Sequence, residues 1–364
     1  MQKKIIALAV AGLASTAVFA QSNVSVYGVA DVYGAGINYA GQHTSAINSS
    51  GAAGSRLGFK GEEDLGGGNK ALFTLEYALA TDGDVAFAAA SSARQQFVGL
   101  TGGMGTVIAG RLQTLVYSHN AAYNPTFGMT VDTNASVGGG AGMAVLTAER
   151  LNNAVAYVSP KIGGVTLGLA HTRNAAATEA GTTNANTIAS EASAKYDNGP
   201  LSLGTVYRTA PTTGAYAIKS EGNSSYAVGG AYDFGVAKLM ANYATQIDNG
   251  GADTSRLKSV NVGAVVPVSA KGALVLSRTK ADNKSDGDWI TTAVVYKHSL
   301  SARTSLYAGV AEATASGLAS ATQANTATLA GITSYNGVTG AAGGVGSAAN
   351  PNIAAALVGI NHSF

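Results

Sequence analysis

Sixteen short segments of this chain alternate between apolar residues and small or polar residues, with the period of two expected for β-strands. Within residues 224–234, Val228 and Tyr232 share one face. Gly229 and Asp233 share the opposite face. The sixteen predicted strands cover residues 24–39, 55–62, 70–80, 93–101, 106–111, 153–159, 165–173, 191–196, 201–208, 224–234, 236–245, 258–266, 273–281, 289–300, 304–312 and 354–364.

Short connections alternate strictly with longer ones between these segments. Each short connection follows a longer one, so all the longer loops leave the same rim, and both chain ends lie at the other rim. Short turns at one rim and long loops at the other are typical of outer-membrane barrels. The sequence therefore predicts an all-β fold, a 16-stranded antiparallel transmembrane β-barrel. The seven short connections are residues 63–69, 102–105, 160–164, 198–200, 235, 267–272 and 301–303.

A barrel must close because an exposed strand edge cannot satisfy its backbone hydrogen bonds in lipid. Sixteen strands make a cylinder too wide for side chains to fill, so an aqueous channel is expected. Residues 112–149, between Arg111 and Arg150, belong to the third long connection, which is far longer than an ordinary hairpin loop. We predict that this loop folds back into the barrel and narrows it.

The N-terminus has the pattern of a secretory leader. Lys3 and Lys4 precede an apolar run at residues 5–19, and Ala20 ends a small-residue cleavage site. The leader is therefore predicted at residues 1–20 and the barrel at residues 21–364. The run is too short to span a membrane comfortably, and no later segment has 18 consecutive apolar residues.

Composition agrees with an exported barrel. Charged residues make up 12% of the chain, against about 25% in ordinary soluble domains. Loss of the two leader lysines from 22 Lys and Arg would leave as many basic as acidic side chains, so nucleic acid is not an expected partner. The chain has no cysteine and 48 glycines. A soluble β-sandwich alternates too, but it buries the opposite face, so alternation alone leaves both folds open.

Five parts of the sequence carry a family resemblance: SVYGVADVYGAGINY, SRLGFKGEEDLGGGNKALFTLEYALATDGD, RQQFVGLTGGMGTVIAGR, NNAVAYVSPKIGGVTLGLAH and the terminal Phe364. They resemble the Gram-negative general porins, especially the β-proteobacterial branch. The resemblance spans the mature chain and is strongest up to about residue 173. It implies a sixteen-stranded homotrimer in outer-membrane lipid that passes small hydrophilic solutes by passive diffusion past an inward third loop.

The resemblance also suggests residues for a pore constriction. Arg56, Arg94 and Arg150 match wall arginines of the family, and Arg56 lies opposite the lipid-facing Leu57 and Phe59. Rings of arginine or lysine that line a narrow aqueous passage favour anions. The alternative is that each arginine pairs with a nearby acid at a rim. Lys60 and Arg111 are further candidates for the constriction, and Arg208 and Arg278 are candidates for other parts of the wall.

The tip of the predicted inward loop departs from the family pattern. Residues 125–128, Pro-Thr-Phe-Gly, have Thr126 where enteric relatives have an acid. Asp132 and Glu149 are the acidic candidates left in the loop. A weak negative side facing the arginines predicts a weakly anion-selective channel.

Two other functions compete with a diffusion channel. A barrel enzyme has little support, because the histidines are scattered and no H-E-x-x-H motif occurs; no cofactor or metal is expected. An adhesin that uses the loops at residues 113–152 and 313–353 remains the second alternative. The leading prediction is a porin, not an enzyme, in the outer membrane, with small anions as favoured solutes.

Overall fold

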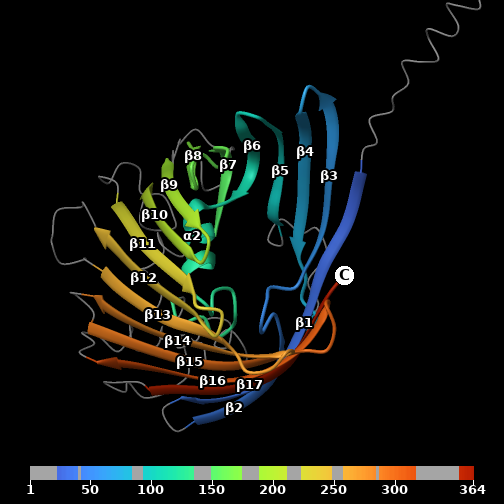
Figure 1. Cartoon of the computed structure of the whole chain (residues 1–364). Helices are drawn as coiled ribbons and strands as arrows, with labels where there is room; N and C mark the ends of the chain where they lie inside the picture. The colour runs from blue at the N-terminus through green and yellow to red at the C-terminus, as the bar shows by residue number, and fades with distance from the viewer. Residues whose placement is uncertain are drawn as a thin grey trace, which may run out of the picture.

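The computed structural model describes residues 23–39, 42–83, 93–134, 149–173, 188–210, 223–247, 257–283, 287–316 and 352–364. The predicted leader lies outside these residues, as does most of the connection predicted at 313–353. Within the described residues, one antiparallel sheet of seventeen strand segments encloses one helix (Figure 1). The segments are β1 (Asn23–Tyr39), β2 (Gln42–Ser49), β3 (Arg56–Gly66), β4 (Asn69–Ala78), β5 (Ala93–Gly102), β6 (Gly105–Gln113), α2 (Leu115–Tyr123), β7 (Arg150–Val158), β8 (Val165–Thr172), β9 (Ala189–Asn198), β10 (Leu201–Ala210), β11 (Asn223–Asp233), β12 (Lys238–Ile247), β13 (Leu257–Pro267), β14 (Gly272–Asn283), β15 (Gly287–Ser299), β16 (Thr304–Ser316) and β17 (Asn352–Ser363).

The seventeen segments make sixteen barrel strands, because β2 and β3 lie end to end along β1. The first part of β1 pairs with β3, from Asn23 to Val29. Its second part pairs with β2, from Val32 to Tyr39. The closed, 16-stranded antiparallel barrel predicted from the sequence is therefore confirmed.

The sequence pattern predicts no strand between the segments at residues 24–39 and 55–62, which is wrong in part, since Gln42–Ser49 form β2. The segment has few apolar residues, so its alternation does not indicate a strand. In the structure Ile47 points outward and Asn48 points inward. The break between β2 and β3 is held by the inward Asp31 carboxylate, which accepts hydrogen bonds from the backbone N–H groups of residues 51, 52 and 53 at 2.8, 3.0 and 3.1 Å.

The barrel closes between the first and last strands. β1 and β17 pair antiparallel from Val29–Ser363 to Tyr39–Ile353. Gly28 and Phe364 extend this seam through two reciprocal backbone hydrogen bonds of 3.1 Å. The seam leaves no lipid-exposed edge at these residues, as spanning strands require.

The two faces of the wall differ in polarity. Outward residues such as Val98, Val228 and Val260 are exposed and apolar. Inward residues such as Asn242 and Asn261 are polar and buried by the protein itself. This distribution confirms the predicted apolar-out, polar-in pattern of a transmembrane barrel. Among the described residues, no helix combines the length and the apolar character needed to cross a membrane.

The short turns gather at one rim as predicted. In the turn between β3 and β4, Gly66, Gly67 and Gly68 have φ of 81°, 61° and 79°, a left-handed conformation that glycine adopts without strain. One connection at the other rim departs from the alternation, because β14 ends at Asn283 and β15 begins at Gly287. These strands continue beyond their predicted ends, so only three residues separate them.

The seam gives a testable prediction for folding. A Cβ at residue 28 would overlap the ring of Phe364 and lie 2.7 Å from the Arg56 carbonyl oxygen. We expect Gly28→Val to lower the free energy of unfolding by about 1–3 kcal/mol, as overpacking does. The measurement is the urea midpoint of the protein folded in lipid vesicles.

Gly34→Val is the matched control, since Gly34 lies on the same face of β1 and a Cβ added there would have no atom within 4 Å. Equal midpoints for the two variants would contradict the proposed role of the Gly28–Phe364 contact.

Candidate functional site

The third long loop enters the barrel and begins with α2, which packs against the inner side of β8 to β12 (Figure 1). The Thr114 hydroxyl caps the helix by accepting the Tyr117 N–H at 2.9 Å. The wall also caps it: the Glu191 carboxylate on β9 accepts the Leu115 N–H at 2.6 Å. Glu191 is in turn paired with Arg208 on β10 at 2.6 Å, and both side chains are buried. A buried ion pair of the wall therefore holds the N-terminus of α2.

Glycines on the inner wall make room for the loop. A Cβ at Gly204 or Gly229 would lie 2.6 or 2.5 Å from atoms of the Tyr123 side chain. Gly263 on β13 faces Pro125 in the same way. The ring of Tyr123 thus packs directly on the wall backbone, and its hydroxyl lies 3.1 Å from the Ser202 hydroxyl.

The helix also binds the wall through amides. His119 Nε2 lies 3.0 Å from Asn242 Oδ1, and Asn242 Nδ2 donates to Asn120 Oδ1 at 3.2 Å. The His119 ring is 4.9 Å from the Tyr123 ring. Burial lowers the pKa of His119 below its usual value, and the hydrogen bond to Asn242 opposes this shift only in part. His119 therefore stays neutral in the docked helix near pH 7.

The segment after α2 reaches two further parts of the wall. Thr133 Oγ1 lies 2.8 Å from Ser277 Oγ and accepts from Asn261 Nδ2 at 3.0 Å. Thr130 N–H donates to the Gly51 carbonyl at 2.9 Å, beside the break between β2 and β3. The loop thus crosses the interior and narrows it, which confirms the predicted inward fold.

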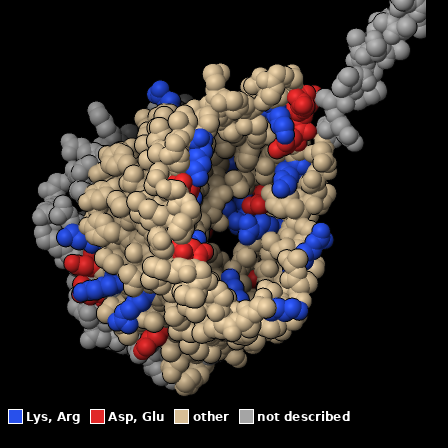
Figure 2. All heavy atoms as spheres, in the orientation of Figure 1, with Lys and Arg blue, Asp and Glu red and all other residues tan. Residues whose placement is uncertain are grey.

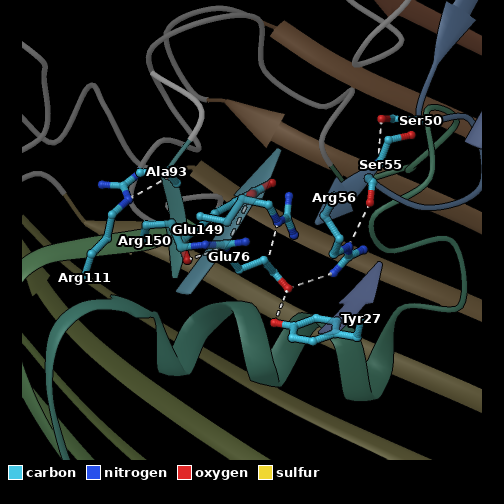
Figure 3. Close-up of polar contacts among 11 residues, drawn as sticks. Tyr27, Ser50, Ser55, Arg56, Glu76, Ala93, Arg111, Glu149 and Arg150 are labelled. Carbon is cyan, nitrogen blue, oxygen red and sulfur yellow. Dashed lines mark hydrogen bonds and ion pairs between the residues drawn. The ribbon is translucent and has the colours of Figure 1, made fainter. Parts of the chain in front are cut away.

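Basic side chains gather on the wall that faces the loop, around the hollow seen in Figure 2. Arg56 on β3 and Arg94 on β5 both approach Glu76 on β4, at 4.0 and 2.7 Å. The Glu76 side chain is 4% exposed, against 23% for Arg56 and 15% for Arg94. Tyr27 completes the group by donating its hydroxyl to Glu76 at 3.0 Å (Figure 3). One carboxylate therefore serves two guanidinium groups.

Arg150 connects this group to the loop. Its guanidinium carbon lies 4.9 Å from the centre of the Tyr117 ring on α2. Its Nη1 donates to the Glu149 carbonyl at 2.9 Å and lies 3.4 Å from the Glu149 carboxylate, which is 60% exposed. Of the two carboxylates in the described part of the loop, Glu149 is exposed and Asp132 is buried.

Two more predicted cations extend the basic wall. Arg111 on β6 donates to the Ala93 carbonyl at 3.0 Å and to the Asn152 side-chain oxygen. Lys60 on β3 lies 5.3 Å from the centre of the Tyr27 ring and is exposed. Neither forms an ion pair with any carboxylate of the described residues.

Two β-bulges place the arginines. Between Leu75 and Tyr77 the β4–β5 register shifts, so that Glu76 faces two residues of β5, one of them Arg94. A second shift sets Arg111 opposite two residues of β7. Bulges re-aim side chains in this way, and the even alternation of the sequence gives no sign of them.

The structure does not place Thr126 and Asp132 on the open surface of the channel. Thr126 is 0% exposed and Asp132 is 4% exposed. Asp132 accepts from Asn124 Nδ2 at 2.7 Å and from two backbone N–H groups of the loop. Thr126 N–H and hydroxyl both donate to Asn124 Oδ1. Both side chains hold the loop in shape, because a tight turn buries its own polar groups and must pair them.

Glu76 and Glu191 were not among the residues predicted from the sequence. The sequence contains a pattern that points to each of them. Glu76 lies two residues after Thr74, on the inward face of β4, and Glu191 pairs with Arg208 in the register of β9 and β10. Arg208 was predicted to line the wall, but without a partner. Inward acids next to inward arginines would have revealed both pairs.

The buried Glu191–Arg208 pair gives a stability prediction. Glu191→Gln leaves the buried Arg208 charge unpaired, so we expect a loss of about 3–5 kcal/mol in the free energy of unfolding. The double variant Glu191→Gln with Arg208→Met removes that charge and should recover most of the loss, since Gln can still accept the Leu115 N–H. Urea unfolding in lipid vesicles measures both. If the double variant is no more stable than the single variant, the loss of unfolding free energy comes from a weakened helix cap and not from the unpaired charge.

His119 gives a pH prediction. Its pKa in the folded protein lies below the unfolded value of about 6.5, so its contribution to stability is present above that pH and is lost as the pH falls below it. We expect wild type to lose more unfolding free energy than His119→Gln between pH 7.5 and pH 5. Equal losses would mean that His119 takes up its proton while docked.

Known proteins are similar to this chain in sequence and in fold. A family model described as Gram-negative porin matches residues 7–318. Outer membrane porin protein 32 of Delftia acidovorans is 33% identical over 327 residues, or 85% of this chain and 89% of that protein. An outer membrane porin protein of Bordetella pertussis is 27% identical over 363 residues, or 85% of this chain and 93% of that protein.

Solved structures agree with these relatives. The anion-selective porin from Comamonas acidovorans superposes with a TM-score of 0.72 at 28% identity, over 94% of this chain and 100% of that chain. OmpF of Salmonella typhi shares the fold with a TM-score of 0.65 at 16% identity, over 94% of this chain and 97% of that chain. With a closed sixteen-stranded wall and an inward loop, this chain belongs to the Gram-negative porin family and forms a diffusion channel in the outer membrane.

Proposed function

We propose that this porin is weakly anion-selective and that its selectivity is set where the basic wall faces the inward loop. The observation that carries the proposal is the shortage of negative charge there: Glu76 is shared by Arg56 and Arg94. The proposed constriction residues are Arg56, Lys60, Arg94, Arg111 and Arg150, with Glu76 and Glu149 as their counter-charges. Their excess of positive charge attracts anions into a narrow aqueous passage.

The loop adds little charge to oppose these cations. The Asp132 carboxylate is occupied by hydrogen bonds within the loop. Residues 135–148, which lie outside the described residues, contain no Asp, Glu, Lys or Arg. We therefore remove Thr126 and Asp132 from the residues proposed to face the ions and retain Glu149. The relative from Comamonas acidovorans that is described as anion-selective supports the same sign of selectivity.

We further propose export with cleavage after Ala20 and assembly as a homotrimer in outer-membrane lipid. The basic and apolar pattern of residues 1–20 supports the cleavage. A Vibrio cholerae OmpT described as a trimer form shares the fold with a TM-score of 0.62 at 15% identity. The solutes are small anions and small hydrophilic molecules, which cross by passive diffusion, with no cofactor and no covalent chemistry.

Planar bilayers test the channel and its selectivity together. Wild type should give conductance steps in groups of three and an anion-directed reversal potential in a salt gradient. Arg56→Ser with Arg94→Ser should shift the reversal potential toward cations, and Glu76→Gln should shift it toward anions. In water, a unit charge at about 4 Å contributes about 1 kcal/mol, so each shift should be a few-fold in permeability ratio and larger at low salt.

Asp132→Asn is the control, because its buried carboxylate does not face the ions in this proposal. A clear cation preference of wild type, or a shift by Asp132→Asn as large as that by Glu76→Gln, would contradict the selectivity mechanism. A folded barrel that conducts no current would instead favour a surface-binding role such as an adhesin.

A further inference from the structure

Residues 50–55 leave the wall of the barrel where β2 ends and β3 begins, and they turn into the interior (Figure 1). The pairing of β1 with β3 ends at Val29, and its pairing with β2 begins at Val32. A Cβ added at Gly51 would overlap the hydroxyl of Tyr307, an inward residue of β16. Residues 50–55 therefore form an inward segment that packs against the inner face of the wall.

Asp31 on β1 holds this inward segment to three strands. Besides the backbone N–H groups of residues 51–53, its carboxylate accepts the Tyr307 hydroxyl of β16 at 2.5 Å and Asn361 Nδ2 of β17 at 2.9 Å. The Ser55 hydroxyl accepts the Asp31 N–H at 3.0 Å and donates to the Asp31 carbonyl at 3.1 Å. Asp31 is 0% exposed, and a fully paired buried carboxylate of this kind rigidifies the groups around it.

The tip of the third loop rests on one end of the inward segment. Thr130 donates its N–H to the Gly51 carbonyl at 2.9 Å and its hydroxyl to the Ser50 carbonyl at 3.1 Å. Ser50 has a φ of 75°, which is uncommon for a residue other than glycine. The Ser55 N–H donates to the Ser50 hydroxyl oxygen at 2.8 Å and stabilises this conformation. The carbonyl groups that bind the loop are therefore fixed by the fold of the inward segment.

The other end of the inward segment contacts the arginines of the basic wall. Arg56 Nε donates to the Gly54 carbonyl at 2.8 Å. A Cβ added at Gly54 would lie 3.1 Å from Arg94 Nη1. Figure 3 shows Ser55 and Arg56 in succession, with the Arg56 guanidinium beside Glu76. The same short segment therefore contacts the loop tip and both arginines that share Glu76.

We propose that Asp31 is a positioning residue for ion selectivity. Through the inward segment it fixes the tip of the third loop and the guanidinium groups of Arg56 and Arg94 relative to the path of the ions. Asp31 itself is buried and does not touch the ions, so it acts by geometry, whereas Glu76 acts by its charge. This inference rests on the proposed role of the basic wall in selectivity.

Charge and geometry predict opposite results for Asp31→Asn. Loss of a negative charge alone would shift the reversal potential toward anions, as expected for Glu76→Gln. Asparagine, however, replaces one acceptor oxygen by an amide NH2 group that faces N–H donors, so the inward segment is released. If Arg56 then moves from about 4 Å to about 7 Å from the ions, the anion preference falls about two-fold in permeability ratio.

Planar bilayers test this with two variants and a control. We expect Asp31→Asn to shift the reversal potential toward cations by about two-fold in permeability ratio and to raise the open-channel current noise, because the loop tip loses its support. Tyr307→Phe removes one donor to Asp31 without a change of charge and should shift both in the same direction, by less. Thr245→Val is the control: it removes a buried hydrogen bond to the Leu257 carbonyl, away from the inward segment, and should leave both unchanged.

Three results would overturn the positioning role. A shift of Asp31→Asn toward anions would mean that Asp31 acts through its charge. An equal shift in Thr245→Val would assign the effect to general loosening of the wall. If Asp31→Asn does not fold, an unchanged reversal potential and noise in Tyr307→Phe are decisive against the role. All shifts are measured relative to wild type, so a cation-selective wild type would contradict the selectivity proposal without deciding this test.

Discussion

Pairing of every backbone N–H and C=O in lipid is the constraint on which the structure depends. No water is available in the lipid to form hydrogen bonds with the backbone of an unpaired strand edge, so the first and last strands must pair with each other. The β1–β17 ladder and the reciprocal bonds of Gly28 and Phe364 form this seam. The same constraint explains β2. This polar segment has one large outward apolar residue, but it still forms a strand because its backbone pairs with β1.

Closure with sixteen strands leaves an interior that side chains alone do not fill, so the inward loop must be held by the wall. The contacts are polar and specific: Glu191 caps α2, Asn242 holds His119 and Asn120, and Thr133 lies among polar side chains of β13 and β14. Inner-wall glycines let Tyr123 approach the backbone. The loop is therefore a packed part of the barrel, although it connects two strands.

Burial decides which charges of this interior can act on passing ions. Glu76 and Asp132 are both nearly inaccessible, but their partners differ. Glu76 neutralises part of the charge on Arg56 and Arg94, which remain partly exposed. Asp132 is occupied by amides of its own loop. A carboxylate contributes to selectivity through the charge that it leaves uncompensated nearby, and this depends on its neighbours in space.

The sequence by itself determined the barrel, its sixteen strands, the inward loop and the inward direction of residues such as Arg56, because alternation and connection length record which residues face lipid. Only the tertiary structure decided the pairings across strands. Register and local packing decide the bulges at Arg94 and Arg111, the sharing of Glu76 by two arginines and the burial of Asp132 within its loop. They also decide that Arg278 lies on the outer face of the barrel. Alternation with a period of two shows which residues of one strand share a face, but it does not show which residue of the neighbouring strand each one pairs with. A single extra residue at a bulge changes that pairing.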